Sequence, residues 1–139
     1  MTPRSGIGSR KTIRLRGIVT SGVSQSRFFT EIPWVKKQFA EKLDITPYPG
    51  TFNITVVPED RERLDQIREA SGIELPPEEK NFCAASSFHA LINHKVKGAV
   101  IIPQVPDYPP AKLELIAAEN IKESLSLADG DLVEVEVYL

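Results

Sequence analysis

Two neutral oxygen-bearing side chains stand two positions apart in the segment Thr51-Phe52-Asn53. In an extended chain, alternate side chains point to the same face, so Thr51 and Asn53 share one face and Phe52 points to the other. A hydroxyl and an amide oxygen on a rigid strand suit Mg²⁺, provided that water and phosphate oxygens complete the coordination shell. Alternation with period two by itself favours a simpler interpretation, a polar strand surface that faces solvent. The residues alone leave both interpretations open.

A run of small polar residues over positions 21–27, Ser-Gly-Val-Ser-Gln-Ser-Arg, is a candidate phosphate-binding loop. Glycine lets backbone N–H groups approach a ligand closely, and arginine suits bidentate contact with phosphate. An ordinary connection between a strand and a helix accounts for the same residues. Glu114 is the third candidate, because it interrupts the apolar segment Leu113-Glu-Leu-Ile. Its carboxylate either binds a hydroxyl or amide in a cavity or faces water.

The histidines and the cysteine offer weaker signals. His89 and His94 lack the spacing that is typical of zinc sites, and we expect His94 to be solvated in a turn. Cys83 lies among small residues, and we expect it to be a buried, inert thiol in a strand.

Hydrophobic periodicity indicates the elements that must position the candidate residues. Alternating residues predict strands over residues 11–20, 51–57 and 132–137. Apolar segments predict further strands over residues 82–92, 99–102 and 113–117. Helical spacing predicts helices over residues 30–43, 58–70 and 120–127. Five or six short strands with a few helices predict a mainly β fold, a small β-barrel with added helices.

Length and composition indicate how these elements are organised. The chain has 139 residues, 41% of them hydrophobic and 26% charged, which predicts one folded domain over residues 12–139 after a flexible arm, residues 1–11. The single cysteine fits a reducing compartment, so we expect a cytoplasmic protein. The net charge of −2 argues against a general nucleic-acid footprint, and the absence of a long apolar run argues against a membrane partner. We expect a monomer.

The order of several segments carries more information than any one of them. The first half contains Gly17-Ile-Val-Thr-Ser-Gly22, Arg27-Phe28-Phe29 and Pro47-Tyr48-Pro49-Gly50-Thr51-Phe52-Asn53-Ile54. The second half contains Gly98-Ala-Val-Ile-Ile-Pro103, Leu113-Glu-Leu-Ile-Ala117 and Leu127-Ala-Asp-Gly-Asp131. In this order they resemble the archaeal-type CTP-dependent riboflavin kinases over residues 13–138. The resemblance implies a six-stranded cradle-loop β-barrel with added helices. It also implies transfer of the terminal phosphate of CTP to the 5′-hydroxyl of riboflavin, which gives FMN and CDP.

The resemblance also implies a role for each candidate residue. Thr51 and Asn53 would be the Mg²⁺ ligands, and Arg27 and Asn53 the catalytic residues. The CTP phosphates would be held by Gly22, Val23, Ser24, Gln25, Ser26 and Arg27. The cytosine would be read by Glu119, Asn120, Ile121 and Lys122. On the flavin side, Glu114 would face riboflavin, and the proline-rich loop that contains Pro106 would border its ring system.

The chain departs from the family pattern within the substrate-binding segments. The family loop reads Ser-Gly-x-Gly-Glu-Gly-Arg, whereas this chain has Ser24, Gln25 and Ser26 at the last three positions before the arginine. Pro106 stands where the family often has threonine. These changes leave two alternatives to a riboflavin kinase. One is a diverged small-molecule kinase with another nucleotide or acceptor, and the other is a non-catalytic ligand-binding or regulatory barrel.

Overall fold

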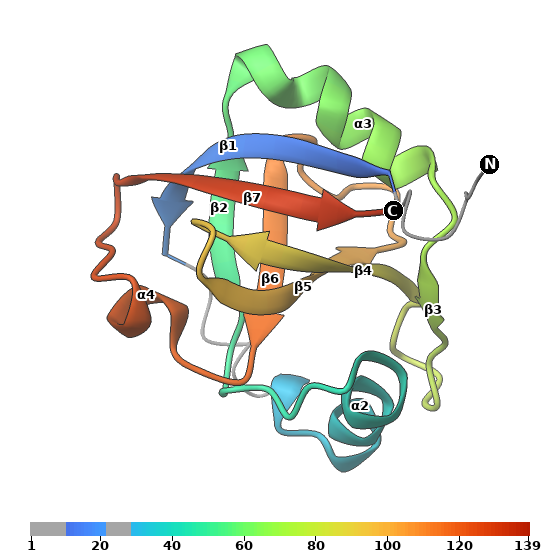
Figure 1. Ribbon diagram of the computed structural model, residues 1–139. Coiled ribbons are helices and arrows are strands. Elements are labelled where there is room, and N and C mark those ends of the chain that lie inside the picture. Colours follow the sequence, from blue (N-terminus) through green and yellow to red (C-terminus); the bar gives the residue numbers. More distant parts are fainter. Residues whose placement is uncertain (1–10, 22–28) are drawn as a thin grey trace, which may run out of the picture.

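Six antiparallel strands close into a barrel in the computed structural model, which describes residues 11–21 and 29–139 (Figure 1). The strands are β1 (Thr12–Thr20), β2 (Phe52–Val56), β4 (Ala85–Ile92), β5 (Val96–Pro103), β6 (Lys112–Ala117) and β7 (Leu132–Tyr138). They are hydrogen-bonded in the order β4-β5-β6-β2-β1-β7, and β7 returns to pair with β4. The predicted six-stranded barrel is therefore confirmed. A short seventh strand, β3 (Ile73–Leu75), pairs with β4 outside the ring and was not predicted.

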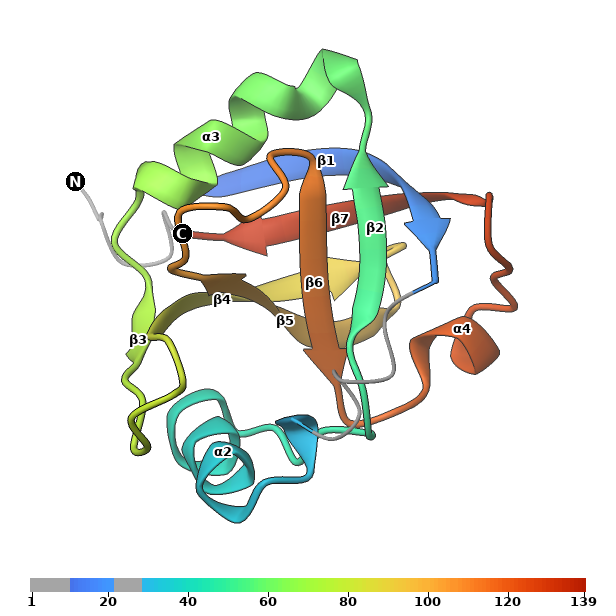
Figure 2. The same cartoon turned by 180° about the vertical axis from the view of Figure 1, so that it is seen from behind.

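Alternating residues fill the inside of the barrel. In β1, Ile13, Leu15 and Val19 are buried, while Arg14 and Arg16 point outward. The helix α3 (Arg61–Glu69) lies across one end of the barrel and follows a 3-10 turn, Pro58–Asp60 (Figures 1 and 2). Its side chains Leu64 and Ile67 are fully buried in the same core, as their helical spacing predicts.

A second apolar cluster lies outside the barrel. The helix α2 (Pro33–Gln38) continues into a π-helical turn, Phe39–Leu43, and packs against the outer faces of β5 and β6. The middle of β5 and the end of β6 are therefore buried on both faces, which explains why residues 98–102 and 115–117 are apolar without clear alternation. The helix begins at Pro33 and not at Thr30, whose hydroxyl accepts a hydrogen bond from the N–H of Gly50 at 2.7 Å.

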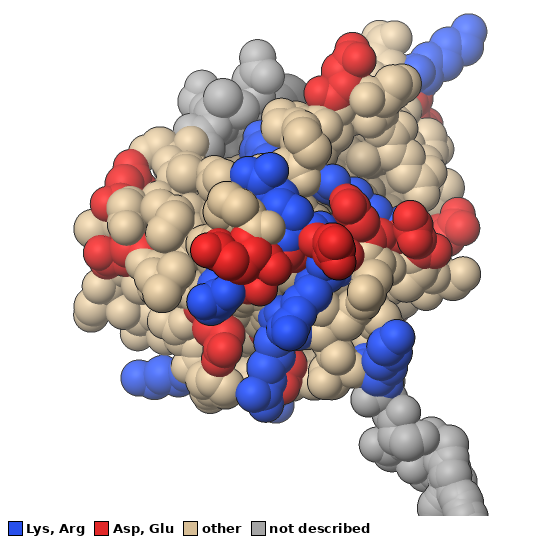
Figure 3. Space-filling view, turned by 90° about the horizontal axis from the view of Figure 1, so that it is seen from above, with Lys and Arg blue, Asp and Glu red and all other residues tan. Residues whose placement is uncertain are grey.

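Charges of both signs are mixed over the end of the barrel that α3 covers (Figure 3). The Asp60 carboxylate at the start of this helix is buried and accepts three hydrogen bonds from Arg16, from its N at 2.9 Å, its Nε at 3.0 Å and its Nη2 at 3.3 Å. The hydrogen bond from the Arg16 side chain holds the pKa of the Asp60 carboxyl below its ordinary value, against the opposing effect of burial. This contact fastens α3 to β1.

Two minor expectations have different outcomes. Cys83 is exposed and precedes β4, so the prediction of a buried strand thiol is wrong. His94 is exposed in the turn between β4 and β5, as expected, and contacts the Glu134 carboxylate. Within the described part of the chain, no helix has the length and apolar character needed to cross a membrane.

Candidate active site

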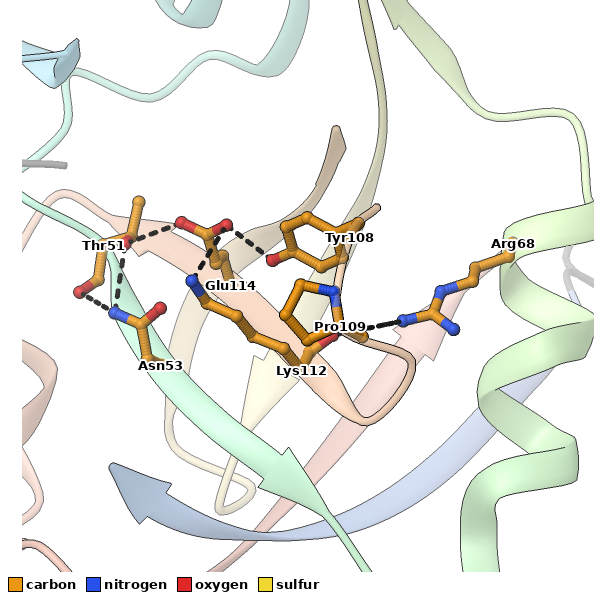
Figure 4. Close-up of polar contacts among 7 residues, drawn as sticks. All are labelled: Thr51, Asn53, Arg68, Tyr108, Pro109, Lys112 and Glu114. Atoms are coloured by element: carbon orange, nitrogen blue, oxygen red, sulfur yellow. Dashed lines mark hydrogen bonds and ion pairs between the residues drawn. The ribbon is translucent and has the colours of Figure 1, made fainter. Parts of the chain in front are cut away.

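Thr51, Asn53 and Glu114 form one hydrogen-bonded group on the outer face of β2 and β6 (Figure 4). Asn53 is directly opposite Glu114 in the β2–β6 pairing, so their side chains lie side by side. The Thr51 hydroxyl donates to Glu114 Oε1 at 3.0 Å. The Asn53 amide donates through Nδ2 to the Thr51 carbonyl at 3.0 Å and to Thr51 Oγ1 at 3.1 Å. The structure thus brings the predicted metal pair and the predicted flavin-facing carboxylate together.

The orientation of Asn53 leaves its amide oxygen available. Asn53 is only 3% exposed, so a solvent-facing strand surface does not describe this residue. Because the Thr51 carbonyl can only accept hydrogen bonds, the NH₂ group must face it and Oδ1 points the other way. None of the described residues donates a hydrogen bond to this oxygen. A buried oxygen to which no described residue donates a hydrogen bond suits a cation or a ligand donor.

The oxygens of Thr51 and Asn53 fit Mg²⁺ if water and substrate oxygens complete the coordination shell. Thr51 and Asn53 offer neutral oxygens, and Mg²⁺ commonly keeps several waters and binds substrate phosphates when the protein supplies only a few ligands. Over residues 11–21 and 29–139, no group of three or more His, Cys, Asp or Glu side chains could hold a metal ion. A metal at Thr51 and Asn53 would therefore take most of its other ligands from water and from substrate oxygens.

A polar pocket opens beside this group, between the start of β2 and the segment that follows β6. Figure 2 shows these two strands side by side, with α2 and α4 (Ile121–Ser124) flanking their lower ends. The Tyr48 N–H donates to the Ala117 carbonyl at 2.8 Å and joins the two walls. The pocket is lined by Thr20, Tyr48, Pro49, Gly50, Thr51, Phe52, Asn53, Leu115, Ala117, Glu119, Asn120, Ile121 and Lys122. It unites the predicted metal ligands with all four residues of the predicted cytosine-binding segment.

The predicted phosphate loop lies outside the described residues. It comprises Gly22, Val23, Ser24, Gln25, Ser26 and Arg27. Its preceding residue, Ser21, donates a hydrogen bond to the Asp129 carboxylate, which also accepts one from Lys122 Nζ at 2.7 Å. The contact with Lys122 is the main reason that the pKa of Asp129 lies below its ordinary value. Asp129 therefore connects the residue before the predicted loop to Lys122 of the predicted cytosine-binding segment, a contact that its place in a turn motif did not reveal.

An apolar pocket lies on the other side of Thr51. It is lined by Phe29, Phe39, Thr51, Asn81, Phe82, Cys83, Ala85, Ile101, Pro103, Lys112 and Glu114. The rings of Phe29 and Phe82 have centroids 6.0 Å apart, and Trp34 meets Phe82 edge-on at 5.3 Å. Glu114 is among the lining residues, whereas Pro106 is exposed and is not among them; the flavin contacts of both residues stay predictions. Thr51 is the residue that the linings of both pockets share.

Two residues that the sequence did not single out contact the second oxygen of Glu114. The Tyr108 hydroxyl donates to Glu114 Oε2 at 2.5 Å, and Lys112 Nζ lies 3.9 Å from the same atom (Figure 4). Burial, and then the hydrogen bond to Glu114, raise the pKa of the Tyr108 phenol far above its ordinary value, so it remains a donor at physiological pH. In the sequence, Tyr108 is simply an aromatic residue within a proline-rich segment, and this pattern does not indicate which residue its hydroxyl contacts.

A family model for CTP-dependent riboflavin kinases, described as a domain of unknown function (DUF120), matches residues 19–137. The chain belongs to this riboflavin kinase family. A riboflavin kinase of Archaeoglobus fulgidus is 39% identical over 131 residues, and one of Sulfurisphaera tokodaii is 37% identical over 135 residues. A riboflavin kinase of Pyrobaculum arsenaticum is 34% identical over 131 residues.

These relatives of the riboflavin kinase family differ in length. The matched regions cover 92%, 93% and 92% of this chain in the Archaeoglobus, Sulfurisphaera and Pyrobaculum proteins respectively. This chain spans 56% of the Archaeoglobus protein and 62% of the Pyrobaculum protein, but 98% of the Sulfurisphaera protein.

Proposed function

We propose that this chain transfers the terminal phosphate of CTP to the 5′-hydroxyl of riboflavin, giving FMN and CDP. The observation that carries the proposal is the position of Thr51, which lines both a polar pocket and an apolar pocket. A phosphoryl donor and an acceptor that occupy two adjoining pockets meet at their boundary. Such positioning is the main requirement of phosphoryl transfer, which demands little covalent chemistry from the protein.

The polar pocket suits the nucleotide. Glu119, Asn120, Ile121 and Lys122 would contact the cytosine, and the loop Gly22–Arg27 would hold the phosphates, with Arg27 balancing their charge. Thr51 and Asn53 would hold Mg²⁺, which when bound neutralises charge on the transferred phosphate. The neutral ligands of this site leave most of that coordination to phosphate oxygens and water.

The apolar pocket suits the acceptor. Aromatic side chains from Phe29, Phe39 and Phe82 line it, and they match the flat, apolar ring system of a flavin. Glu114 lies at the edge of this pocket and next to Thr51, so its carboxylate can accept a hydrogen bond from the attacking hydroxyl. The new bond joins the riboflavin oxygen to phosphorus, the bond between phosphorus and the CDP oxygen breaks, and the hydroxyl proton passes to water. A loose transition state does not require Glu114 to be a strong base.

A direct assay tests this proposal. The purified chain is incubated with riboflavin, Mg²⁺ and either CTP or ATP, and FMN is detected by chromatography. We expect FMN from CTP and none from ATP. FMN from ATP alone would reject the nucleotide assignment, and no FMN from either nucleotide would reject the reaction. The second result would favour the diverged kinase or the non-catalytic barrel.

A further inference from the structure

The contacts around Glu114 continue away from both pockets and end on α3. Arg68 of this helix donates through Nη2 to the carbonyl oxygen of Pro109 at 3.3 Å and to that of Lys112 at 3.4 Å. Figure 4 shows the guanidinium of Arg68 reaching the loop from the side opposite Thr51 and Asn53. One planar group thereby ties together both ends of the segment 109–112.

The loop between β5 and β6 is stiff enough to transmit this restraint. Pro106, Pro109 and Pro110 each have a nearly fixed φ angle, and Tyr108 is limited to extended conformations because it precedes a proline. Tyr108 immediately precedes the segment 109–112, so ordering this segment restrains the backbone of Tyr108 and limits the directions that its side chain can take. Tyr108 in turn donates its hydroxyl hydrogen to Glu114 Oε2.

The two oxygens of Glu114 have separate partners. Oε1 accepts from the Thr51 hydroxyl, at the boundary between the two pockets, and Oε2 accepts from Tyr108. The Glu114 side chain is only 15% exposed, so water cannot readily replace a lost partner. Lys112 Nζ lies 3.9 Å from Oε2, so a carboxylate that loses the Tyr108 hydrogen bond is drawn toward this ammonium group and away from Thr51. The contact between Oε1 and Thr51 thus depends on the contact between Oε2 and Tyr108.

We propose that Tyr108 and Arg68 are positioning residues for the acceptor substrate: Arg68 orders the proline-rich loop, and Tyr108 holds Glu114 against Thr51 where the two pockets meet. The inference rests on the proposed function, because it takes riboflavin as the molecule that Glu114 orients. Tyr108 and Arg68 line neither the polar nor the apolar pocket. Their effect on riboflavin is therefore indirect, and it reaches the polar pocket only through Thr51, so CTP binding should change less than riboflavin binding.

The experiment uses two variants and two matched controls. Tyr108→Phe removes only the hydroxyl, and Arg68→Met removes the guanidinium and keeps most of the side-chain volume. Tyr138→Phe is the first control, because the Tyr138 hydroxyl also donates to a carboxylate, that of Glu136, at 3.1 Å. Arg63→Met is the second control, because Arg63 also lies on α3 and donates to a carbonyl, that of Arg14, at 3.1 Å.

We expect the variants to weaken the binding of riboflavin and to leave the binding of CTP nearly unchanged. Tyr108→Phe and Arg68→Met raise the KM and the dissociation constant for riboflavin about tenfold. Tyr108→Phe loses one part-buried hydrogen bond, and Arg68→Met loses one exposed and one part-buried hydrogen bond. The KM for CTP stays within about twofold, and both controls keep wild-type values for both substrates. Arg68→Lys restores part of the riboflavin affinity, because an ammonium group can reach one of the two carbonyls.

Measuring riboflavin binding by fluorescence separates this inference from the proposed function. Unchanged riboflavin binding and KM in both variants would overturn the inference and leave the reaction standing. Equal losses for riboflavin and CTP would also overturn it, because they would indicate a general structural role. A wild-type chain that binds riboflavin without making FMN would reject the reaction, and the binding constants of the variants would still decide the inference. A wild-type chain that binds no riboflavin would reject both.

Discussion

Replacing Asn53 with alanine is the sharpest test of the site, because this residue joins the local structure to the proposed chemistry. Its Nδ2 donates two hydrogen bonds to Thr51, at 3.0 and 3.1 Å, and its Oδ1 is the buried oxygen assigned to the metal. Asn53→Ala removes both functions but leaves the backbone pairing of β2 with β1 and β6 in place.

The expected loss of stability is modest. Each neutral hydrogen bond contributes about 1 kcal/mol, so the two bonds to Thr51 together account for about 2 kcal/mol of the free energy of unfolding. For a domain of this size, that loss lowers Tm by roughly 5–10 °C. A stability of about 5–15 kcal/mol would still leave Asn53→Ala folded at room temperature.

The expected loss of activity is much larger. Residues that only support a metal ligand commonly contribute 10- to 100-fold, so losing a direct ligand should lower FMN formation by at least about 100-fold. The assay follows FMN from CTP and riboflavin while Mg²⁺ is varied, and urea unfolding reports stability. Thr55→Ala is the matched control, since Thr55 lies two positions further along β2 with an exposed side chain.

Two results would refute the reasoning. A folded Asn53→Ala protein that forms FMN at the wild-type rate, with the same dependence on Mg²⁺, would remove Asn53 from the metal site. A loss of activity in Thr55→Ala as large as that in Asn53→Ala would show that the assay responds to strand stability and not to the amide oxygen.

Three further predictions concern the framework and the nucleotide side. Asp60→Asn lowers the free energy of unfolding by about 2 kcal/mol at pH 7, because the amide accepts fewer bonds from Arg16. Arg16 lowers the pKa of Asp60 in the folded state. The difference in free energy of unfolding between the wild type and Asp60→Asn is therefore complete above about pH 4, and it disappears as the pH falls through that lowered pKa. Urea unfolding between pH 7 and 2 checks it, and a constant difference would contradict it. Gly98→Ala destabilises by about 2 kcal/mol or more, because its Cβ would stand 2.3 Å from the Ile116 carbonyl oxygen. Gly130→Ala has open space around its Cβ, and only the φ of +94° at this position opposes the substitution. It should therefore lower the free energy of unfolding by about 1 kcal/mol in the same assay. A larger loss of stability for Gly130→Ala than for Gly98→Ala would contradict this explanation. Asp129→Asn weakens CTP binding severalfold without changing riboflavin binding, since Asp129 contacts Lys122 and Ser21; equilibrium titration with each substrate checks it, and unchanged CTP binding would contradict it.

The strands of the barrel could be predicted where one face is buried and the other is not. Alternation in β1 and β7 follows directly from the pleat of a strand, and both strands appear close to their predicted positions. The strand β3 was missed because three residues between polar segments produce no detectable period. The prediction for Cys83 failed because small neighbouring residues indicate neither burial nor strand on their own.

The sequence by itself determined the class of fold, the shared face of Thr51 and Asn53, and the family to which the chain is similar. The predicted strands and the shared face depend on residue types at short spacing, which backbone geometry converts into local structure, whereas the family resemblance depends on the order of motifs along residues 13–138. Only the tertiary structure decided that Asn53 is buried, that Glu114 lies directly opposite it, and that Tyr108 reaches the same carboxylate. The register of β2 with β6 and the path of the proline-rich loop set these contacts. Both depend on how distant segments pack. Residues that are far apart in the chain share no periodic pattern from which a contact could be inferred.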